Sequence, residues 1–247
     1  MDKESLFTAR WHLNKGYVVP EGEPRDAALA AITAALGVPP PGASSGEAPA
    51  HETGPIRISQ ETWLAGTGVF PVIWAPLTAE EFPRYLSSLP DMGAASWGWS
   101  PTGVTLHHMA EPSLAQRPLG ILPEHGRNLR DYYVGLGWKS GPHLFVDEDQ
   151  VWLFSPLTSR GVHAVSFNGG RIGIEMLGDY DNEDPWTGRG LRVVTMAARA
   201  IAALCQRFGW VPDGGTVSFH RDDPKTTKTC PGRRILKDLF LTKVREW

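Results

Sequence analysis

A short stretch near the C-terminus, residues 219–232, holds the side chains of this chain best suited to chemistry. It reads Phe-His-Arg-Asp-Asp-Pro-Lys-Thr-Thr-Lys-Thr-Cys-Pro-Gly, and so places an imidazole (His220), an ammonium (Lys228) and a thiol (Cys230) close together. The Asp-Pro and Pro-Gly steps indicate a loop. Histidine and cysteine thiolate are ligands that zinc prefers. The alternative is ordinary: a lone cysteine is usually a small buried hydrophobe, and a lone histidine a satisfied polar residue.

A metal site of this kind needs a third ligand from elsewhere in the chain. The segment Val104-Thr105-Leu106-His107-His108 is the obvious donor, because its residues favour a strand that ends in two histidines. Successive strand side chains point to opposite faces, so only one histidine of the pair can reach a shared metal. The other is expected to form hydrogen bonds within the core. Two histidines, one cysteine and an open position for water are typical of a hydrolytic zinc site.

Four segments of the chain, in order, resemble the zinc-dependent N-acetylmuramoyl-L-alanine amidases and peptidoglycan recognition proteins. The first is residues 104–110. The second reads Ser-Gly-Pro-His-Leu-Phe-Val-Asp (140–147) and is followed by Val-Trp. The third comprises Gly-Val-His-Ala (161–164), Phe-Asn (167–168) and Arg-Ile-Gly-Ile-Glu-Met (171–176), and the fourth is residues 219–232. Together they cover roughly residues 100–240 of the 247.

The resemblance implies a ligand set and a reaction. His107, His220 and Cys230 match the zinc ligands of that family. Glu175, in Ile-Gly-Ile-Glu, matches the carboxylate that acts as general base in the bacterial branch, and Lys228 matches the lysine that steadies the oxyanion. The implied reaction is zinc-dependent hydrolysis of the amide between N-acetylmuramic acid and L-alanine, in peptidoglycan or in muropeptides.

The resemblance also implies substrate contacts and shows two departures. His163 matches a histidine that lines the substrate groove, and Asn168 is assigned to the same side. Many family members have a catalytic tyrosine at the position of Pro142, which cannot donate a hydrogen bond. The branch with the Ile-Gly-Ile-Glu carboxylate often has aspartate where this chain has Cys230. We therefore expect an active site of the carboxylate type that mixes features of two branches.

The elements that must position these residues follow an α/β pattern from residue 56 onward. Strands are predicted near 144–146, 151–154, 171–177 and 216–219, and helices over 78–89, 128–136 and 191–208. Interleaved in this way they predict a central mixed β-sheet flanked by helices. The resemblance implies that this is a single catalytic domain like that of the amidases and peptidoglycan recognition proteins. In the segment 171–176, glycine and glutamate share one strand face, which would let the carboxylate face a cleft; an ordinary exposed strand glutamate is the alternative.

Residues 1–55 are predicted to form an N-terminal extension to a zinc amidase domain over 56–247. An alanine-rich segment, residues 26–36, predicts a short helix that ends at Gly37, and residues 41–55 have the composition of a linker. The extension could bind the cell wall, dock a lysis partner or a host protein, or pack against the domain. Its alanine-rich helix has no aromatic patch, which favours packing or docking over sugar binding.

Composition limits the partners and the location. The formal net charge is −3, so there is no basic excess to indicate nucleic acid as the main partner. The N-terminus lacks the basic and apolar stretches of a secretory signal, and no run reaches the ~18 apolar residues of a membrane helix. We therefore expect a protein that is cytoplasmic as synthesised. Two roles fit: a phage or prophage endolysin released to the cell wall on lysis, or a recycling enzyme acting on imported muropeptides.

Two further hypotheses belong to other classes. A non-catalytic module could use the same fold to bind peptidoglycan, although in this family that usually accompanies loss of a zinc ligand, and all three are present. A purely structural zinc is the other, against which Glu175 and Lys228 argue.

Overall fold

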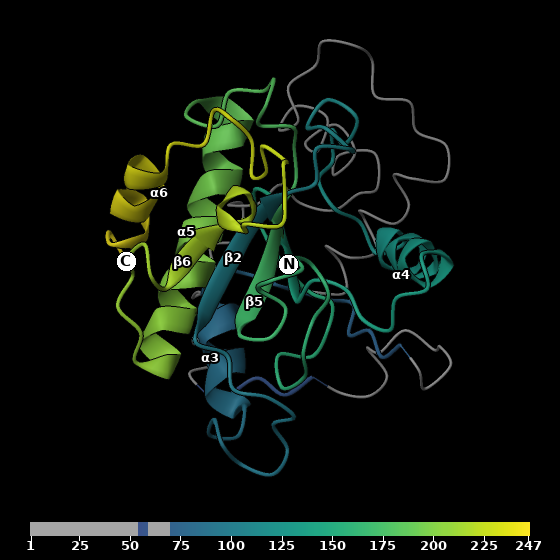
Figure 1. Ribbon diagram of the computed structural model, residues 1–247, viewed down its shortest axis with the longest axis vertical. Helices are drawn as coiled ribbons and strands as arrows, with labels where there is room; N and C mark the ends of the chain where they lie inside the picture. Colours follow the sequence, from purple (N-terminus) through teal and green to yellow (C-terminus); the bar gives the residue numbers. More distant parts are fainter. Residues whose placement is uncertain (1–53, 59–69) are drawn as a thin grey trace, which may run out of the picture. The chain divides into compact units, whose positions relative to one another are not determined.

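A computed structural model describes residues 54–58 and 70–247. The helix predicted for residues 26–36, and nearly all of the predicted linker and extension, lie outside these residues. In the described part of the chain, six strands form one mixed sheet in the order β1-β4-β3-β5-β2-β6 (Figure 1). Their bounds are Ala75–Leu77 (β1), Gly103–His108 (β2), Leu144–Val146 (β3), Val151–Leu153 (β4), Arg171–Met176 (β5) and Val217–Phe219 (β6).

The sheet has an antiparallel and a parallel half. β1 and β4 pair antiparallel, as do β4 and β3, whereas β3, β5, β2 and β6 run parallel to one another. The carboxyl ends of parallel strands lie at the same edge of a sheet, so the ends of β2, β5 and β6 lie together. This arrangement confirms the predicted central mixed sheet.

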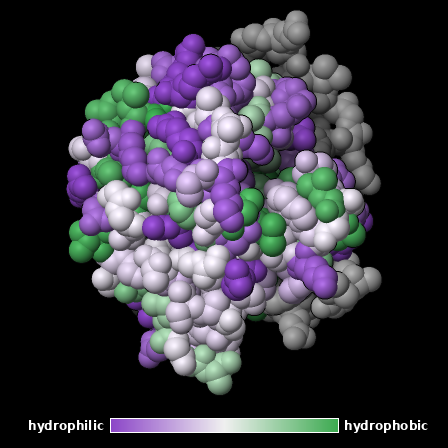
Figure 2. Space-filling model, viewed as in Figure 1, coloured by the Kyte–Doolittle hydropathy of each residue, from purple (hydrophilic) through white to green (hydrophobic). Residues whose placement is uncertain are grey.

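Helices cover both faces of the sheet. The long helix α5 (Gly188–Phe208) packs on one face against β3, β4 and β5, and it also contacts α3 (Glu81–Ser88) and α6 (Lys237–Val244) (Figure 1). Helix α4 (His125–Gly135) lies against the other face, because Gly126 touches the ring of Trp74. Figure 2 shows hydrophobic side chains gathered over α4, where Val134 and Leu136 are exposed.

Strand alternation explains which side chains fill the core. Leu106 on β2 and Ile174 on β5 are paired and fully buried, and they point to the face opposite that of their neighbours His107 and Glu175. On the face that carries Glu175, Phe145 and Trp152 follow in register, and Trp74 stacks on Trp152 with ring centroids 4.8 Å apart. The apolar side chains of the strands therefore form two core layers, one between the sheet and α5 and one between the sheet and α4.

Most predicted elements are present, with shifted ends. A capping box opens the helix predicted from residue 78: the Glu81 carboxylate accepts the N–H of Thr78 at 3.0 Å, and the Thr78 hydroxyl accepts the N–H of Glu81 at 3.2 Å. Helix α4 begins three residues earlier than predicted, and α5 also begins three residues earlier. Strand β1 and helix α6 were not predicted. Both are short, and at such lengths local sequence gives a weak signal.

Candidate active site

The parallel register of the sheet brings a histidine and a carboxylate side by side. His107 on β2 lies directly opposite Glu175 on β5, and the neighbouring pair on the same face is Thr105 with Gly173. His107 Nδ1 lies 3.8 Å from Glu175 Oε1, and the two side chains are 2% and 14% exposed. The sheet thus places an imidazole and a carboxylate next to each other on a face that is largely buried from solvent.

The second histidine and the cysteine come from the chain that leaves β6. Leu106 pairs with Phe219 at the end of β6, so the next residue, His220, lies beside His107 with ring centroids 4.6 Å apart. His220 begins a short 3-10 helix, η2 (His220–Asp222), and the loop then returns to Cys230. Cys230 Sγ lies 3.6 Å from His107 Nδ1.

Local hydrogen bonds hold this returning loop closed. The Arg221 guanidinium donates to the carbonyls of Gly232 at 2.8 Å and Ile235 at 2.7 Å, and the Arg221 N–H donates to the Cys230 carbonyl at 2.8 Å. Gly232 has φ 105°, and a Cβ there would lie 2.4 Å from the Tyr180 carbonyl carbon, so a side chain would collide with the backbone. The closed loop fixes the distance between its two ends, which carry His220 and Cys230.

The geometry of the three side chains fits a metal ion. One ligand atom from each of His107, His220 and Cys230 lies within 4.8 Å of the others. Zn–S and Zn–N bonds of about 2.3 and 2.0 Å at a tetrahedral angle place sulfur and nitrogen about 3.5 Å apart. The observed 3.6 Å between Cys230 Sγ and His107 Nδ1 matches that separation. The structure therefore brings the sequence-predicted ligands close together, and one separation, from Cys230 Sγ to His107 Nδ1, has the value expected for a tetrahedral zinc.

The two charged side chains of the site differ in exposure. Burial raises the pKa of the Glu175 carboxyl to about 8, and the nearby Lys228 acts in the opposite direction. Lys228 itself is exposed on the loop, and its charge helps to lower the pKa of His107 and His220, for which burial is the main cause. Glu175 can therefore hold a proton near neutral pH while Lys228 supplies a fixed positive charge at the rim.

His108 points away from the cluster, as strand alternation predicts. Its Nδ1 accepts the backbone N–H of Tyr180 at 3.0 Å, which confirms the expected hydrogen-bonded role in the core. Its own backbone N–H donates to Cys230 Sγ at 3.4 Å. A hydrogen bond from an amide stabilises a thiolate, so β2 supplies both the His107 side chain and a hydrogen bond to Cys230.

The two residues predicted to contact substrate lie behind His107. His163 is 8% exposed, and both of its ring nitrogens have partners: His107 Nε2 at 3.1 Å and the Arg171 carbonyl at 2.9 Å. Asn168 Oδ1 accepts the backbone N–H groups of His163 and Ala164, each at 2.8 Å. Their contact with substrate stays a prediction.

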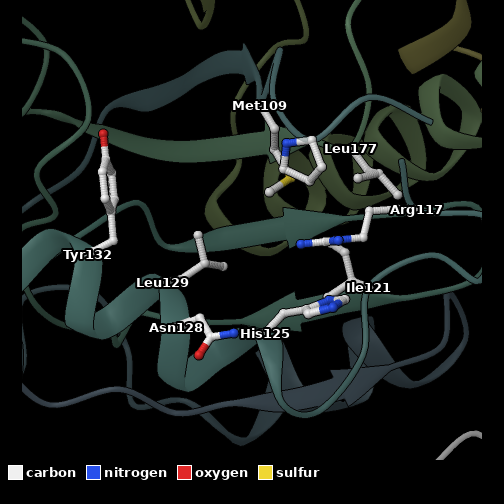
Figure 3. A pocket seen from close by; sticks show the side chains of 9 residues that line it. Met109, Arg117, Ile121, His125, Asn128, Leu129, Tyr132 and Leu177 are labelled. Atoms are coloured by element: carbon white, nitrogen blue, oxygen red, sulfur yellow. The ribbon is translucent and has the colours of Figure 1, made fainter. Parts of the chain in front are cut away.

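A small hollow adjoins the site on the side of α4. Met109 and Leu177 directly follow strands β2 and β5, two residues beyond His107 and Glu175, and they face α4 across a cavity of about 150 Å³ (Figure 3). Arg117 and His125 lie at one end and Tyr132 at the other. His125 Nδ1 accepts the N–H of Leu122, so its Nε2 carries the proton of the neutral ring. The hollow combines apolar walls with N–H donors.

The site lies within a region that matches a known family. The model of the Amidase_2 family, described as N-acetylmuramoyl-L-alanine amidase, matches residues 98–233, which is more than half of the chain. The chain belongs to this family of amidases. The matched region contains every predicted site residue, from His107 to Cys230. The activity of this amidase is hydrolysis of the amide between N-acetylmuramic acid and L-alanine in peptidoglycan.

Solved structures similar to this amidase share low sequence identity with it. N-acetylmuramoyl-L-alanine amidase LysC from Clostridium intestinale URNW is 17% identical, with a TM-score of 0.49, over 60% of this chain and 88% of that chain. The catalytic domain of XlyA is 22% identical, with a TM-score of 0.44, over 59% and 87%. Drosophila PGRP-LB is 19% identical, with a TM-score of 0.44, over 61% and 83%. No curated protein matches the chain. In the part of this amidase that the structure describes, the helices lack the combined length and apolar character needed to cross a bilayer.

Two residues that shape the site, Arg221 and Asp223, were not singled out in the sequence. The Asp223 side chain is buried, and its Oδ2 accepts the N–H of Ser166 at 2.8 Å. This contact ties the loop to the turn that carries His163. Gly173 was noted in the sequence as the small residue that shares a strand face with Glu175. In the structure this glycine lies against the ring of His163.

Proposed function

We propose that this amidase holds a zinc ion on His107, His220 and Cys230, and that Glu175 and Lys228 carry out the proton and charge chemistry around it. The observation that carries the proposal is the convergence of the three ligand atoms within 4.8 Å, with Glu175 Oε1 3.8 Å from one of them. The donor set of two imidazoles and a thiolate is one that zinc prefers. When bound, zinc supplies Lewis-acid chemistry, lowering the pKa of water from 15.7 to about 7 and polarising a carbonyl.

Glu175 is the proton carrier in this proposal. Burial raises the pKa of the Glu175 carboxyl to about 8. The positive charge of a bound zinc would lower that pKa, so that the carboxylate could accept a proton at neutral pH and then return it. Glu175 would take a proton from the attacking water and deliver it to the nitrogen of L-alanine as the amide breaks. Its low exposure limits competition from bulk water.

Lys228 is the electrostatic partner. Its ammonium lies at the exposed rim of the same cluster and acts on His107, His220 and Glu175 through its charge. As the carbonyl is attacked, negative charge develops on its oxygen, and a fixed cation nearby lowers the energy of that state. Lys225, on the same loop, is also exposed, and the proposal gives it no role in the reaction.

The proposal extends to the substrate and to the division of the chain. The catalytic domain would span residues 56–247, which is supported by the family match at 98–233 inside it. Residues 1–55 would serve to dock a lysis partner or a host protein. Intact peptidoglycan and soluble muropeptides both contain the bond that is cleaved, so both belong in the assay.

Metal content and release of stem peptides together test this proposal. We expect one zinc per chain in both the wild type and Glu175→Gln, with hydrolysis lowered at least 10²-fold in the variant because the proton carrier is lost. Glu80→Gln is a matched control, since Glu80 is an exposed carboxylate paired with Arg199, and it should keep full activity.

The other outcomes are informative. A wild type purified without chelator that contains no zinc would contradict the ligand assignment. Full activity in Glu175→Gln would contradict the role of the carboxylate. Zinc without cleavage of either sacculi or muropeptides would point to a protein that binds peptidoglycan fragments without hydrolysing them.

A further inference from the structure

The imidazole of His163 lies behind His107, on the side away from Cys230 and Glu175. His163 Nδ1 lies 3.1 Å from His107 Nε2, and the two rings meet edge to face with centroids 5.1 Å apart. The other nitrogen of His163, Nε2, lies 2.9 Å from the carbonyl oxygen of Arg171. Both histidines are buried, at 2% and 8% exposure, so water does not compete for these contacts.

The Arg171 carbonyl, at the end of this row of hydrogen bonds, determines which ring nitrogens of His163 and His107 carry a proton. A carbonyl oxygen can only accept, so His163 Nε2 must carry the proton that points at Arg171. A neutral imidazole carries one proton, so with Nε2 protonated the Nδ1 of this buried ring is an acceptor. His107 Nε2 must then donate to it, which leaves His107 Nδ1 without a proton. That bare nitrogen is the atom 3.6 Å from Cys230 Sγ.

We propose that His163 is a positioning residue that locks His107 in the tautomer whose Nδ1 faces the metal site. A metal ligand must present a lone pair, and neutral imidazole has one at either nitrogen. Without His163, a proton on Nδ1 would find acceptors in Cys230 Sγ at 3.6 Å and Glu175 Oε1 at 3.8 Å. The competing tautomer is therefore available locally, and the bond to His163 disfavours it.

The fold provides this contact through two further residues. Gly173 lies on the strand face beneath the His163 ring, and a Cβ at 173 would lie 2.5 Å from His163 Cγ, so any side chain would displace the ring. Asn168 Oδ1 closes the turn that carries His163 by accepting two backbone N–H groups at 2.8 Å. Asp223 anchors the same turn to the loop between His220 and Cys230 through Ser166. Asn168 and Gly173 thus act through His163.

The tautomer can be read directly in the metal-free protein. Nitrogen-15 NMR of the imidazole rings should show His107 protonated at Nε2 in the wild type, with its signals assigned by their loss in His107→Gln. In His163→Leu, a substantial fraction should shift to protonation at Nδ1. A wild-type His107 protonated at Nδ1, or a His163→Leu variant that keeps the wild-type tautomer, would overturn the proposal. This readout does not depend on metal.

The second readout is zinc affinity, measured by competition with a chelator. This test rests on the proposed function, because it requires that the site binds zinc. Loss of a partner behind a ligating histidine typically lowers metal affinity by about 10–100-fold, and we expect that loss in His163→Leu. His163→Gln retains one acceptor and one donor, so it should recover much of the affinity. Gly173→Ala should weaken binding because it displaces the ring.

A control separates positioning from general destabilisation. His125→Leu removes another partly buried imidazole bonded to a backbone N–H, in the hollow beside α4 (Figure 3). It should leave zinc affinity unchanged even where the melting temperature falls. Equal loss of affinity in the His125 and His163 variants would overturn the positioning role. A wild type that binds no zinc would defeat the proposed function and still leave the NMR result to decide the tautomer.

Discussion

The two sides of this active site are built in different ways. The sheet side, from β2 and β5, presents His107 and Glu175 in fixed register on a nearly dry face, with His163 behind them. The loop side, from η2 to Gly232, presents His220, Lys228 and Cys230 on irregular chain, part of which is exposed.

The forces that hold the two sides differ accordingly. On the sheet side, ladder hydrogen bonds and packing set the side chains, and desolvation keeps the imidazoles neutral. On the loop side, one guanidinium and two carboxylates hold the backbone through hydrogen bonds to carbonyl and N–H groups. The buried groups of the sheet side suit ligand and proton chemistry, whereas the loop side places the ammonium of Lys228 at the exposed rim of the site.

The largest effect on the loop side should come from Lys228→Met. Removing one group that stabilises an oxyanion typically lowers kcat by about 10²–10³-fold. Zinc content and melting temperature should stay at wild-type values, since the ammonium is exposed and its removal opens no cavity. Steady-state kinetics on a soluble muropeptide would measure the effect. Lys225→Met, on the same loop, is the control and should be near wild type; a comparable loss in both variants would remove the specific role of Lys228.

A smaller effect, on stability and on zinc binding, is expected when the loop loses the hydrogen bonds of the Arg221 guanidinium. Arg221→Met removes hydrogen bonds to the carbonyls of Gly232 and Ile235, and a charged hydrogen bond of this kind contributes about 2 kcal/mol. We expect a comparable fall in the free energy of urea unfolding, together with weaker zinc binding because His220 and Cys230 are no longer held at a fixed distance. The reference variant is Arg233→Met, whose exposed ion pair with Asp181 should contribute less than ~1 kcal/mol. If Arg221→Met binds zinc as tightly as the wild type, Arg221 does not set the spacing between His220 and Cys230.

The smallest expected effect is the contribution of the buried His143, on the sheet side, to the pH dependence of stability. His143 accepts the Gly173 N–H at Nδ1, donates from Nε2 to the Ser159 carbonyl, and stacks on Trp99. Burial, with a smaller effect from His163, lowers its pKa from 6.5 to about 3. The folded state therefore binds fewer protons than the unfolded state between these values, and stability is lost as the pH falls below 6.5. From pH 6.5 to 5.5 this group accounts for about 1 kcal/mol.

Urea unfolding of the metal-free wild type and His143→Gln at both pH values would isolate that contribution. The variant should be less stable at pH 6.5 but should lose less stability on acidification. Parallel losses in the two proteins would mean that His143 is not held neutral by the fold.

Much of the fold was predictable because its signals are local. The alternation in 171–176, the strand that ends at His107 and the apolar stripe of α5 each follow from side-chain period. The capping box at Thr78 and Glu81 is a four-residue pattern whose hydrogen bonds are local to the start of the helix. Strand β1 and helix α6 escaped prediction because they are short and depend on packing against β4 and α5.

By itself, the sequence determined the residue types of the site and the order in which they arrive. The His220 to Cys230 spacing and the strand ending at His107 indicated a metal, and Ile-Gly-Ile-Glu, read through its family resemblance, indicated a carboxylate. Only the tertiary structure decided that His107 faces Glu175 and that His163 backs it, because ladder register joins residues far apart in the chain. A tautomer is set by the partner at the far nitrogen, and no local pattern contains that partner.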